Sequence, residues 1–214
     1  MEYFKLKYST NYDIVGKCFP QSQECENSIS INDPLYLCNN EIPLSEHIYI
    51  PNLLMENNAK FTDLISSSVI KYPIISEKIH EIITNFNHNL VNFHKTKVKK
   101  KSFEKDVFMI SNKTKGFELI DISNAEIHLL EKFKFSKILN FSNFEDLEYA
   151  TKTVQYPNTI AIMKYSISKN YNQDILYVEN IHPEGGAYFF TYRLKEAIKN
   201  AGCTGIEFEP IEFG

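Results

Sequence analysis

The segment with the strongest chemical potential in this chain is His182-Pro183-Glu184-Gly185-Gly186. A histidine and a glutamate two positions apart could act as an acid–base couple, and a glycine pair beside them would leave the backbone open to a ligand. Proline followed by two glycines is also the ordinary composition of a tight turn. Two interpretations of these residues therefore stay open: a turn, or the site of a small enzyme or ligand-binding protein.

Other residues of suitable chemistry lack a suitable spacing. Asp121 ends a predicted strand, where its carboxylate could join such a site or cap the following turn. Cys18 or Cys203 could act as a nucleophile with a histidine, but a lone cysteine is more often inert. The sequence contains no GxSxG, HExxH, GxGxxG or GxxxxGK motif. We therefore predict no catalytic residues, no metal and no cofactor.

Acidic residues gather in two places, a predicted helix over residues 143–153 and the outward face of the last predicted strand. Such residues most often form a solvated face. An inhibitor of a basic protein would use them to steer association and to mimic phosphate groups. The candidate partner-binding residues are Glu145, Asp146, Glu148, Glu207 and Glu209.

The charge balance argues against nucleic acid as a partner. The 214 residues carry a formal net charge of −4, and Arg193 is the only arginine. Arginine is the usual residue for two-pronged recognition of phosphate or guanine, so a nucleic-acid site would have to rely on lysine. Six lysines lie between positions 95 and 105, but no stacking aromatic lies among those of 95–101. We interpret residues 97–101 as a solvated hairpin turn.

The sequence also indicates the compartment. Its start, MEYFKLKY, has no apolar core of a secretory signal, and no apolar run approaches the ~18–20 residues that span a bilayer. The cysteines Cys18, Cys25, Cys38 and Cys203 show no zinc spacing and no CxxC motif. We expect a cytoplasmic protein without a membrane partner. Free thiols are expected, and a disulfide among the first three cysteines is the alternative.

The elements that would position these residues are clearest at the end of the chain. Thr191 can cap a helix whose apolar positions, such as Leu194 and Ile198, recur at four-residue spacing. Gly202 suits the left-handed residue that ends a helix. Residues 206–209 then alternate between apolar and acidic side chains, which predicts a half-buried strand.

The stretch 74–96 matches this helix–strand module without a gap. Ser76 falls on Thr191, Ile83 on Ile198, and Asn87 on Gly202. Asparagine is the best substitute for glycine at a left-handed cap. One interpretation is a duplicated module whose copies share one core. The other is that any two capped helix–strand units look alike.

The whole pattern predicts an α+β protein with a mainly antiparallel sheet and a few packed helices. We expect one domain over residues 1–214, with an irregular N-terminal region at 1–45 and a core at 46–214. A strand at 3–8 opens the chain. Further strands are predicted at 47–50, 90–95, 106–111, 117–122, 159–165 and 175–178, and helices at 61–66 and 77–87. Residues 125–135 allow helix or strand.

The order of these elements resembles a family of bacterial immunity proteins from contact-dependent polymorphic-toxin systems. The resemblance covers residues 47–211 and is weak between 125 and 156. Its most telling motif is Thr191-x-x-Leu194-Lys195-x-Ala197-Ile198, then Gly202, then Gly205-Ile206-x-Phe208-x-Pro210-Ile211. The resemblance implies a cytosolic, non-enzymatic protein that binds and neutralises a cognate toxin protein. It carries over no catalytic residues.

Two main hypotheses follow, and a structure can separate them. A deep pocket lined by His182 and carboxylates would favour the small enzyme or ligand-binding protein. A flat acidic face with exposed aromatic side chains would favour the inhibitor. A purely structural partner of a neighbouring gene product is a third hypothesis, and the sequence leaves the oligomeric state open.

Overall fold

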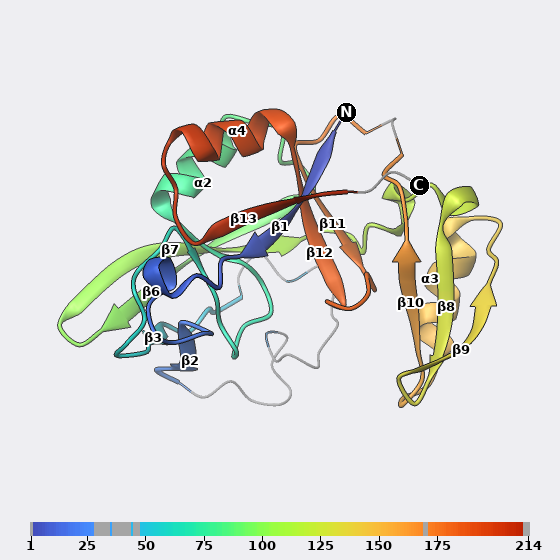
Figure 1. The fold of residues 1–214 in the computed structure, drawn as a ribbon, viewed down its shortest axis with the longest axis horizontal. Helices are drawn as coiled ribbons and strands as arrows, with labels where there is room; N and C mark the ends of the chain where they lie inside the picture. Colours follow the sequence, from blue (N-terminus) through green and yellow to red (C-terminus); the bar gives the residue numbers. More distant parts are fainter. Residues whose placement is uncertain (1, 28–34, 36–43, 45–47, 169–170, 212–214) are drawn as a thin grey trace.

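The computed structural model describes residues 2–27, 35, 44, 48–168 and 171–211. Three β-sheets and a few helices make up this part of the chain (Figure 1). All pairings between its named strands are antiparallel except one, so the predicted α+β class with a mainly antiparallel sheet is confirmed.

The first sheet joins the two ends of the described chain. Its strands are, in spatial order, β11 (Ile175–Glu179), β12 (Gly186–Thr191), β1 (Tyr3–Tyr8) and β13 (Ile206–Pro210). The N-terminal strand β1 is central, because it pairs with β12 on one side and with β13 on the other.

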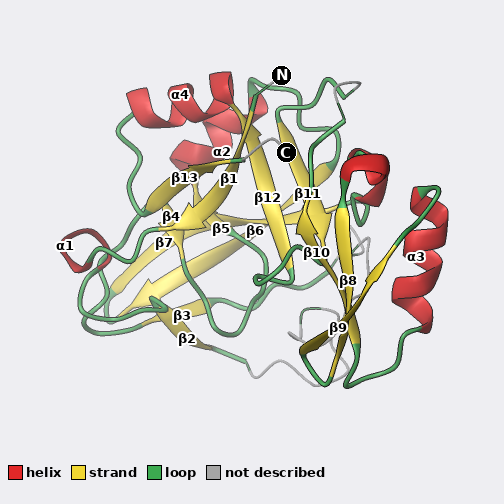
Figure 2. Cartoon of the chain, turned by 45° about the vertical axis from the view of Figure 1, so that its right-hand side comes forward, coloured by secondary structure: helices red, strands yellow, loops and turns green. Residues whose placement is uncertain are grey.

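The second sheet has six strands and carries the longest hairpin. Its spatial order is β2 (Ser22–Cys25), β3 (Leu53–Met55), β6 (Val91–Lys100), β7 (Phe103–Asn112), β5 (Ile74–Ser76) and β4 (Leu64–Ile65). Only β3 and β6 run parallel. Figure 2 shows the hairpin of β6 and β7 extending below the two helices that cover this side.

Helices α2 (Glu77–Thr84) and α4 (Tyr192–Asn200) lie side by side in both views (Figures 1 and 2). The predicted caps are confirmed, because the Ser76 and Thr191 side chains accept hydrogen bonds from helix amides. Ile79 and Ile83 of α2 share a buried cluster with Leu194 and Ile198 of α4. The apolar faces predicted for the two modules therefore meet in one core.

The two modules also sit in matching sheets. One half has the strand order β4-β5-β7-β6 and the other has β11-β12-β1-β13, with α2 following β5 and α4 following β12. In the second half the N-terminal strand β1 takes the place that β7 takes in the first. This correspondence supports the interpretation that the module is duplicated.

Two aspartates join the halves in equivalent ways. Asp174, just before β11, accepts hydrogen bonds from the Thr191 hydroxyl at 2.5 Å and from the amide of Asn87, in the other half, at 3.0 Å. The two oxygens of Asp174 also bind the Nε and Nη2 atoms of Arg193, at 2.6 and 2.5 Å.

Asp63, just before β4, repeats this arrangement. One of its oxygens accepts from the Ser76 hydroxyl at 2.8 Å, and the other accepts from the amide of Thr204, in the opposite half, at 2.8 Å. Asp174 thus joins the N-cap of α4 to the segment after α2, and Asp63 joins the N-cap of α2 to the segment after α4.

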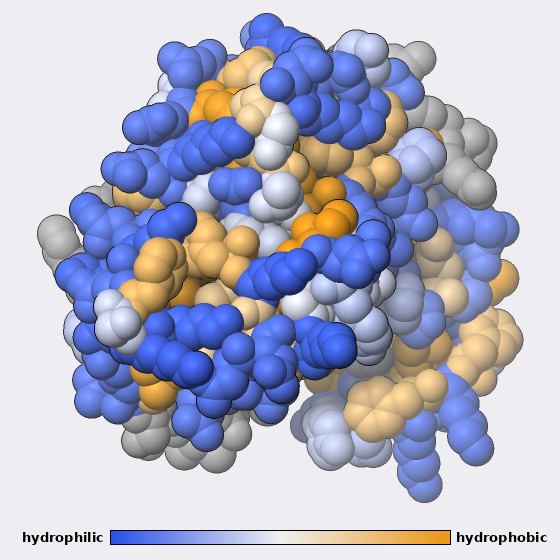
Figure 3. Space-filling model, turned by 60° about the vertical axis from the view of Figure 1, so that its left-hand side comes forward, coloured by the Kyte–Doolittle hydropathy of each residue, from blue (hydrophilic) through white to orange (hydrophobic). Residues whose placement is uncertain are grey.

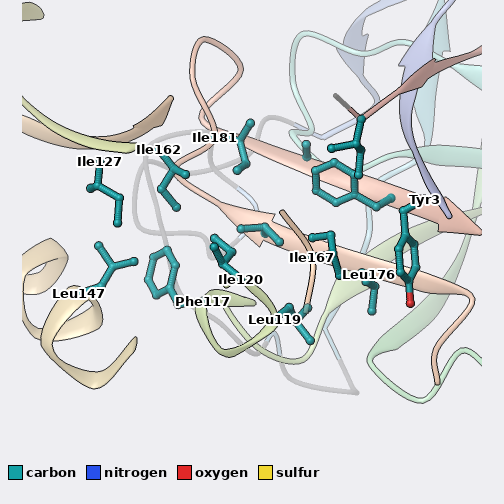
Figure 4. Packing of buried hydrophobic residues seen from close by; sticks show 14 of the residues in the cluster. Tyr3, Phe117, Leu119, Ile120, Ile127, Leu147, Ile162, Ile167, Leu176 and Ile181 are labelled. Atoms are coloured by element: carbon teal, nitrogen blue, oxygen red, sulfur yellow. The ribbon is translucent and has the colours of Figure 1, made fainter. Parts of the chain in front are cut away.

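The third sheet forms a separate unit with α3 (Phe144–Thr153). Its order is β10 (Thr159–Lys164), β8 (Glu126–Glu131) and β9 (Lys134–Leu139). A buried core connects this unit to the first sheet. Figure 4 shows the core running from Leu147 of α3 and Ile127 of β8 to Tyr3 of β1 and Leu176 of β11.

Several predicted elements are wrong in type. The helix expected at 61–66 contains β4, because Leu64 and Ile65 pair with Ile75 and Ile74. The strand expected at 117–122 is replaced by two short 3-10 helices, Phe117–Leu119 and Ile122–Asn124. The first of these follows Gly116, whose φ of 74° places it in the left-handed region.

Further predictions are wrong in extent. The lysine-rich turn expected at 97–101 lies mostly in β6. In this strand, Lys95 and Lys97 form ion pairs with Asp106 and Glu104 of the neighbouring β7. Cross-strand pairing with acidic residues explains why so many lysines fit in one strand. No strand forms at 48–50, and position 47 lies outside the described residues. The N-terminal region, expected to be irregular, contains α1 (Tyr12–Val15) and β2.

Candidate functional site

A pocket of about 670 Å³ lies beside the 182–186 loop, in the range typical of small-molecule sites. Its wall combines β1, the segment 71–73 before β5, and the hairpin of β11 and β12. The segment before β5 belongs to one half of the repeated fold, and the hairpin belongs to the other. The pocket therefore lies where the two halves meet.

The loop itself does not form the acid–base couple that its sequence suggested. Glu184, Gly185 and Gly186 line the pocket, but His182 is exposed and is not part of the wall. The Glu184 carboxylate pairs with the Nζ atom of Lys5 at 2.6 Å. No hydrogen bond or ion pair joins His182 to Glu184 in the described structure.

Asp121 lies away from this pocket and has a local role. Its two oxygens accept hydrogen bonds from the Ser123 hydroxyl at 2.6 Å and from the Asn124 side chain at 2.8 Å. These bonds lower the pKa of the Asp121 carboxyl. Of the two roles that the sequence left open for Asp121, the structure favours the stabilisation of the following turn.

Tyrosines supply much of the pocket wall. Burial raises the pKa of Tyr72, Tyr177 and Tyr188 above the ordinary phenol value, so these hydroxyls stay protonated at neutral pH. The Tyr188 hydroxyl donates to the Ile110 carbonyl oxygen at 3.0 Å. The Tyr72 hydroxyl is buried without a hydrogen-bond partner among the described residues. These phenols can form hydrogen bonds but cannot act as bases.

Two charged residues of the pocket, Glu179 and Lys71, are buried and half-buried, respectively. Glu179 is buried and pairs with Lys115 at 3.3 Å. Burial lowers the pKa of the Lys71 ammonium group, which lies 5.1 Å from the centre of the Tyr72 ring. Sequence reasoning missed these residues, because Lys71 and Glu179 are far apart in the chain and neither belongs to a recognisable motif.

The acidic residues predicted on the helix at 143–153 lie on the exposed side of α3. The Asn143 side chain caps this helix by accepting from the Asp146 amide at 2.8 Å. Glu145 and Asp146 are exposed and form no ion pair with a described residue, whereas Glu148 pairs with Lys152 at 2.8 Å.

An aromatic side chain stands among these carboxylates. Tyr149 is 71% exposed and lies one helical turn after Glu145. Leu147, on the opposite side of the helix, is fully buried in the core. We call Glu145, Asp146 and Tyr149 the α3 surface.

The second acidic group lies elsewhere. Glu207 and Glu209 are exposed on β13, which Figure 1 places near the middle of the molecule, whereas α3 lies at one end. Glu209 pairs with Lys7 of β1 at 2.7 Å. The structure therefore does not bring the five predicted acidic residues together into one face, and lysine partly neutralises the group on β13.

Exposed apolar side chains concentrate on the three-stranded unit. Figure 3 shows mainly hydrophilic residues on one face of the molecule, with hydrophobic side chains in separate small groups. Half of the large hydrophobic residues that the structure exposes belong to the unit of β8, β9, β10 and α3. They are Phe133, Phe135, Ile138, Phe144, Tyr149 and Tyr156.

The remaining chemical predictions concern metals, thiols and membranes. Among the described residues, no cluster of three or more histidines, cysteines or carboxylates could hold a metal ion. Cys18 and Cys203 are free thiols, and Cys38 lies outside the described residues. No helix in the described ranges has the length and apolar character needed to span a membrane.

Comparison with known proteins adds no family assignment. No protein-family model matches the chain, and no curated protein matches its sequence.

Proposed function

We propose that this chain is an immunity or inhibitor protein that binds and neutralises a toxin domain by protein–protein contact and catalyses no reaction. The observation that carries the proposal is the α3 surface, where an exposed tyrosine stands beside two carboxylates that form no ion pair with a described residue. The proposal also rests on the resemblance of the sequence to polymorphic-toxin immunity proteins, which implies a cytoplasmic protein and a cognate toxin as its partner.

The geometry of α3 suits a binding surface. The helix is held by the buried Leu147 and by the Asn143 cap, so a partner would meet a largely preformed surface. Tyrosine is enriched among residues that dominate binding energy, because its large rigid ring buries much area at small entropic cost. Tyr149 would act as the anchor of the contact.

The two carboxylates of the α3 surface would contribute mainly to the rate of association. Glu145 and Asp146 add negative charge that a basic toxin surface would meet before contact. Such steering weakens as salt screens the charges over about 8–10 Å. The complex should therefore form more slowly at moderate salt than at low salt.

The partner can be identified by affinity purification of the tagged protein from its native cell extract at low and moderate salt. A retained protein supports the proposal only if it is encoded beside this gene, stops growth when expressed alone, and is harmless when co-expressed with this chain. Recovery of no such protein would contradict the proposal.

Variants then test the surface. We expect Tyr149→Ala to weaken the complex by about 2 kcal/mol, or about 30-fold, and to reduce protection in the co-expression assay. Tyr12→Ala is the matched control, because Tyr12 is 65% exposed but lies on α1, outside the three-stranded unit. Equal binding by both variants would show that the toxin contacts another surface.

A second candidate function is a ligand-binding protein that uses the pocket beside the 182–186 loop. The specific observation that favours it is the convergence of Lys71, Tyr177 and Glu179 in a wall shared by the two halves. Native mass spectrometry of the purified protein tests it. A bound small molecule that Lys71→Met releases, and that Lys17→Met retains, would support this function. A mass equal to that of the chain alone would contradict it.

A further inference from the structure

The strand β9 is an open edge in the described structure. It is the last strand of the order β10-β8-β9, and its only strand partner is β8. The opposite edge of this sheet is covered, because Ile162 of β10 bonds to Asn180 and His182 through the backbone. Such an open edge presents unpaired backbone donors and acceptors to another chain.

The side chains of β9 are exposed as well. Every residue from Lys134 to Ile138 is exposed, and Leu139 is half-buried. Phe135 is 61% and Ile138 is 55% exposed. Both lie on the face of His128, since Phe135 packs against its ring at 4.8 Å and Ile138 is its register partner. This face is opposite to the one that packs on α3.

The charge of this edge has one sign. Lys132, Lys134 and Lys137 carry three positive charges, and none forms an ion pair with a described residue. No acidic residue occurs between positions 132 and 144, and Glu131 of β8, the register partner of Lys134, forms no ion pair with a described residue. By contrast, Lys95, Lys97 and Lys99 of β6 each have an acidic partner on β7.

We propose that β9 is a docking edge for an extended, acidic segment of a protein partner, which adds to the three-stranded sheet as a further strand. Backbone hydrogen bonds would hold the segment, and alternate apolar side chains would cover Phe135 and Ile138. Alternate acidic side chains would pair with the three lysines. This contact goes beyond the proposed function, because the α3 surface would meet a basic region of a partner and β9 meets an acidic one.

Neither a second copy of the chain nor a purely protective role suits the β9 edge as well. A second copy would place lysines of one β9 near lysines of the other, and this like-charge contact is unfavourable. Lysine also protects free edges from aggregation, but a merely protected edge would not expose Phe133, Phe135 and Ile138 together. An acidic partner strand accounts for both the lysines and the exposed apolar side chains.

The test uses a capped, dye-labelled peptide of about eight residues with alternating glutamate and valine, matched to the length of a strand. Binding is followed by fluorescence anisotropy, and amide hydrogen exchange is measured for residues 134–139. We expect saturable binding that weakens with salt and slows exchange within β9. A second peptide has the same charge but proline in place of the valines, and it should not bind because proline cannot donate backbone hydrogen bonds.

Charge reversal provides the matched variants. Lys134→Glu with Lys137→Glu should weaken binding of the glutamate–valine peptide by about tenfold or more, whereas Lys152→Glu on α3 should leave it nearly unchanged. All three side chains are exposed, and Lys152 loses only a surface ion pair with Glu148, so the variants should unfold at urea concentrations close to that of the parent. The proposal is overturned if the peptide leaves exchange in β9 unchanged, if the proline peptide binds equally well, or if charge reversal has no effect.

Discussion

Replacing Asp174 by alanine tests the connection between the two halves of the fold. The Asp174 side chain is fully buried and accepts hydrogen bonds from Thr191, Arg193 and the amide of Asn87. Burial alone would raise the pKa of this carboxyl, but these hydrogen bonds outweigh it and hold the pKa below its usual value. The alanine variant leaves the Thr191 hydroxyl and the Asn87 amide without their acceptor.

The expected cost follows from these two groups. The buried Thr191 hydroxyl loses its acceptor at a cost of about 1–3 kcal/mol, and the amide of half-buried Asn87 adds at most a similar amount. Part of this is recovered because the variant no longer buries a carboxylate. Arg193 adds little to the loss, because its side chain is 59% exposed and water can replace the lost contact. We expect Asp174→Ala to lower the free energy of unfolding by about 3 kcal/mol.

Urea unfolding at neutral pH measures this loss as a lower midpoint at constant slope. Asp121→Ala is the matched control, since Asp121 accepts its hydrogen bonds from the nearby residues Ser123 and Asn124, and its midpoint should move far less. The folded-state pKa of Asp174 is depressed, so its contribution is present above the unfolded pKa of about 3.9 and is lost as the pH falls through the folded pKa. The difference between parent and Asp174→Ala should narrow in strong acid. A loss below about 1 kcal/mol at neutral pH would refute this reasoning.

Three further predictions concern the same scaffold. Asp63→Ala should destabilise the protein in urea by about 2 kcal/mol, less than Asp174→Ala, because Asp63 is only half-buried whereas Asp174 is fully buried. An equal or larger loss would contradict this. Gly116→Ala should cost about 3 kcal/mol or more in thermal unfolding, because an added Cβ would lie 1.8 Å from the Tyr177 carbonyl oxygen. Gly202→Ala, at a similar positive φ but in open space, should cost only about 1 kcal/mol, and similar losses for both would refute the steric argument. Burial against Phe108, together with nearby His88, lowers the pKa of His80. The free energy of unfolding should therefore fall as the pH drops below about 6.5. His80→Phe should make the free energy of unfolding less dependent on pH in this range.

The three longer helices, α2, α3 and α4, are predictable from the sequence because their signals are local. Ser76 and Thr191 each cap a helix at the position that the sequence indicates. A cap and an apolar face lie within a few residues of each other, so no distant contact is needed to recognise them. The match between the two helix–strand modules is visible in the sequence for the same reason.

Strand order is not predictable in this way. The role of β1 as the counterpart of β7 depends on the meeting of the two chain ends, and no local pattern encodes it. The two residues of β4 are too few to show a period, and their pairing with β5 depends on a segment later in the chain. The strand β9 is not recognisable from sequence, because its apolar residues do not alternate with polar ones. Phe135 and Ile138 share a face only through an irregularity in the pairing with β8.

The candidate sites also differ in whether local sequence signals or tertiary contacts define them. Glu145, Asp146 and Glu148 can be identified because the helix that carries them can be identified. The pocket can be predicted only in part from the sequence. The 182–186 loop correctly indicates Glu184 as a lining residue, but it also indicates His182, which does not line the pocket. Lys71 joins that wall through the meeting of the two halves, which is a tertiary contact that sequence spacing does not report.

The most direct test of the central claim is a titration of the purified chain with the toxin domain encoded beside its gene, by calorimetry at low and moderate salt. We expect a one-to-one complex that Glu145→Lys with Asp146→Lys weakens mostly at low salt and that Tyr149→Ala weakens at both salt concentrations. Glu24→Lys, at an exposed acidic position on β2, should bind like the parent. No binding by the parent chain, or equal affinities for all variants at both salt concentrations, would contradict the claim that the α3 surface holds a toxin.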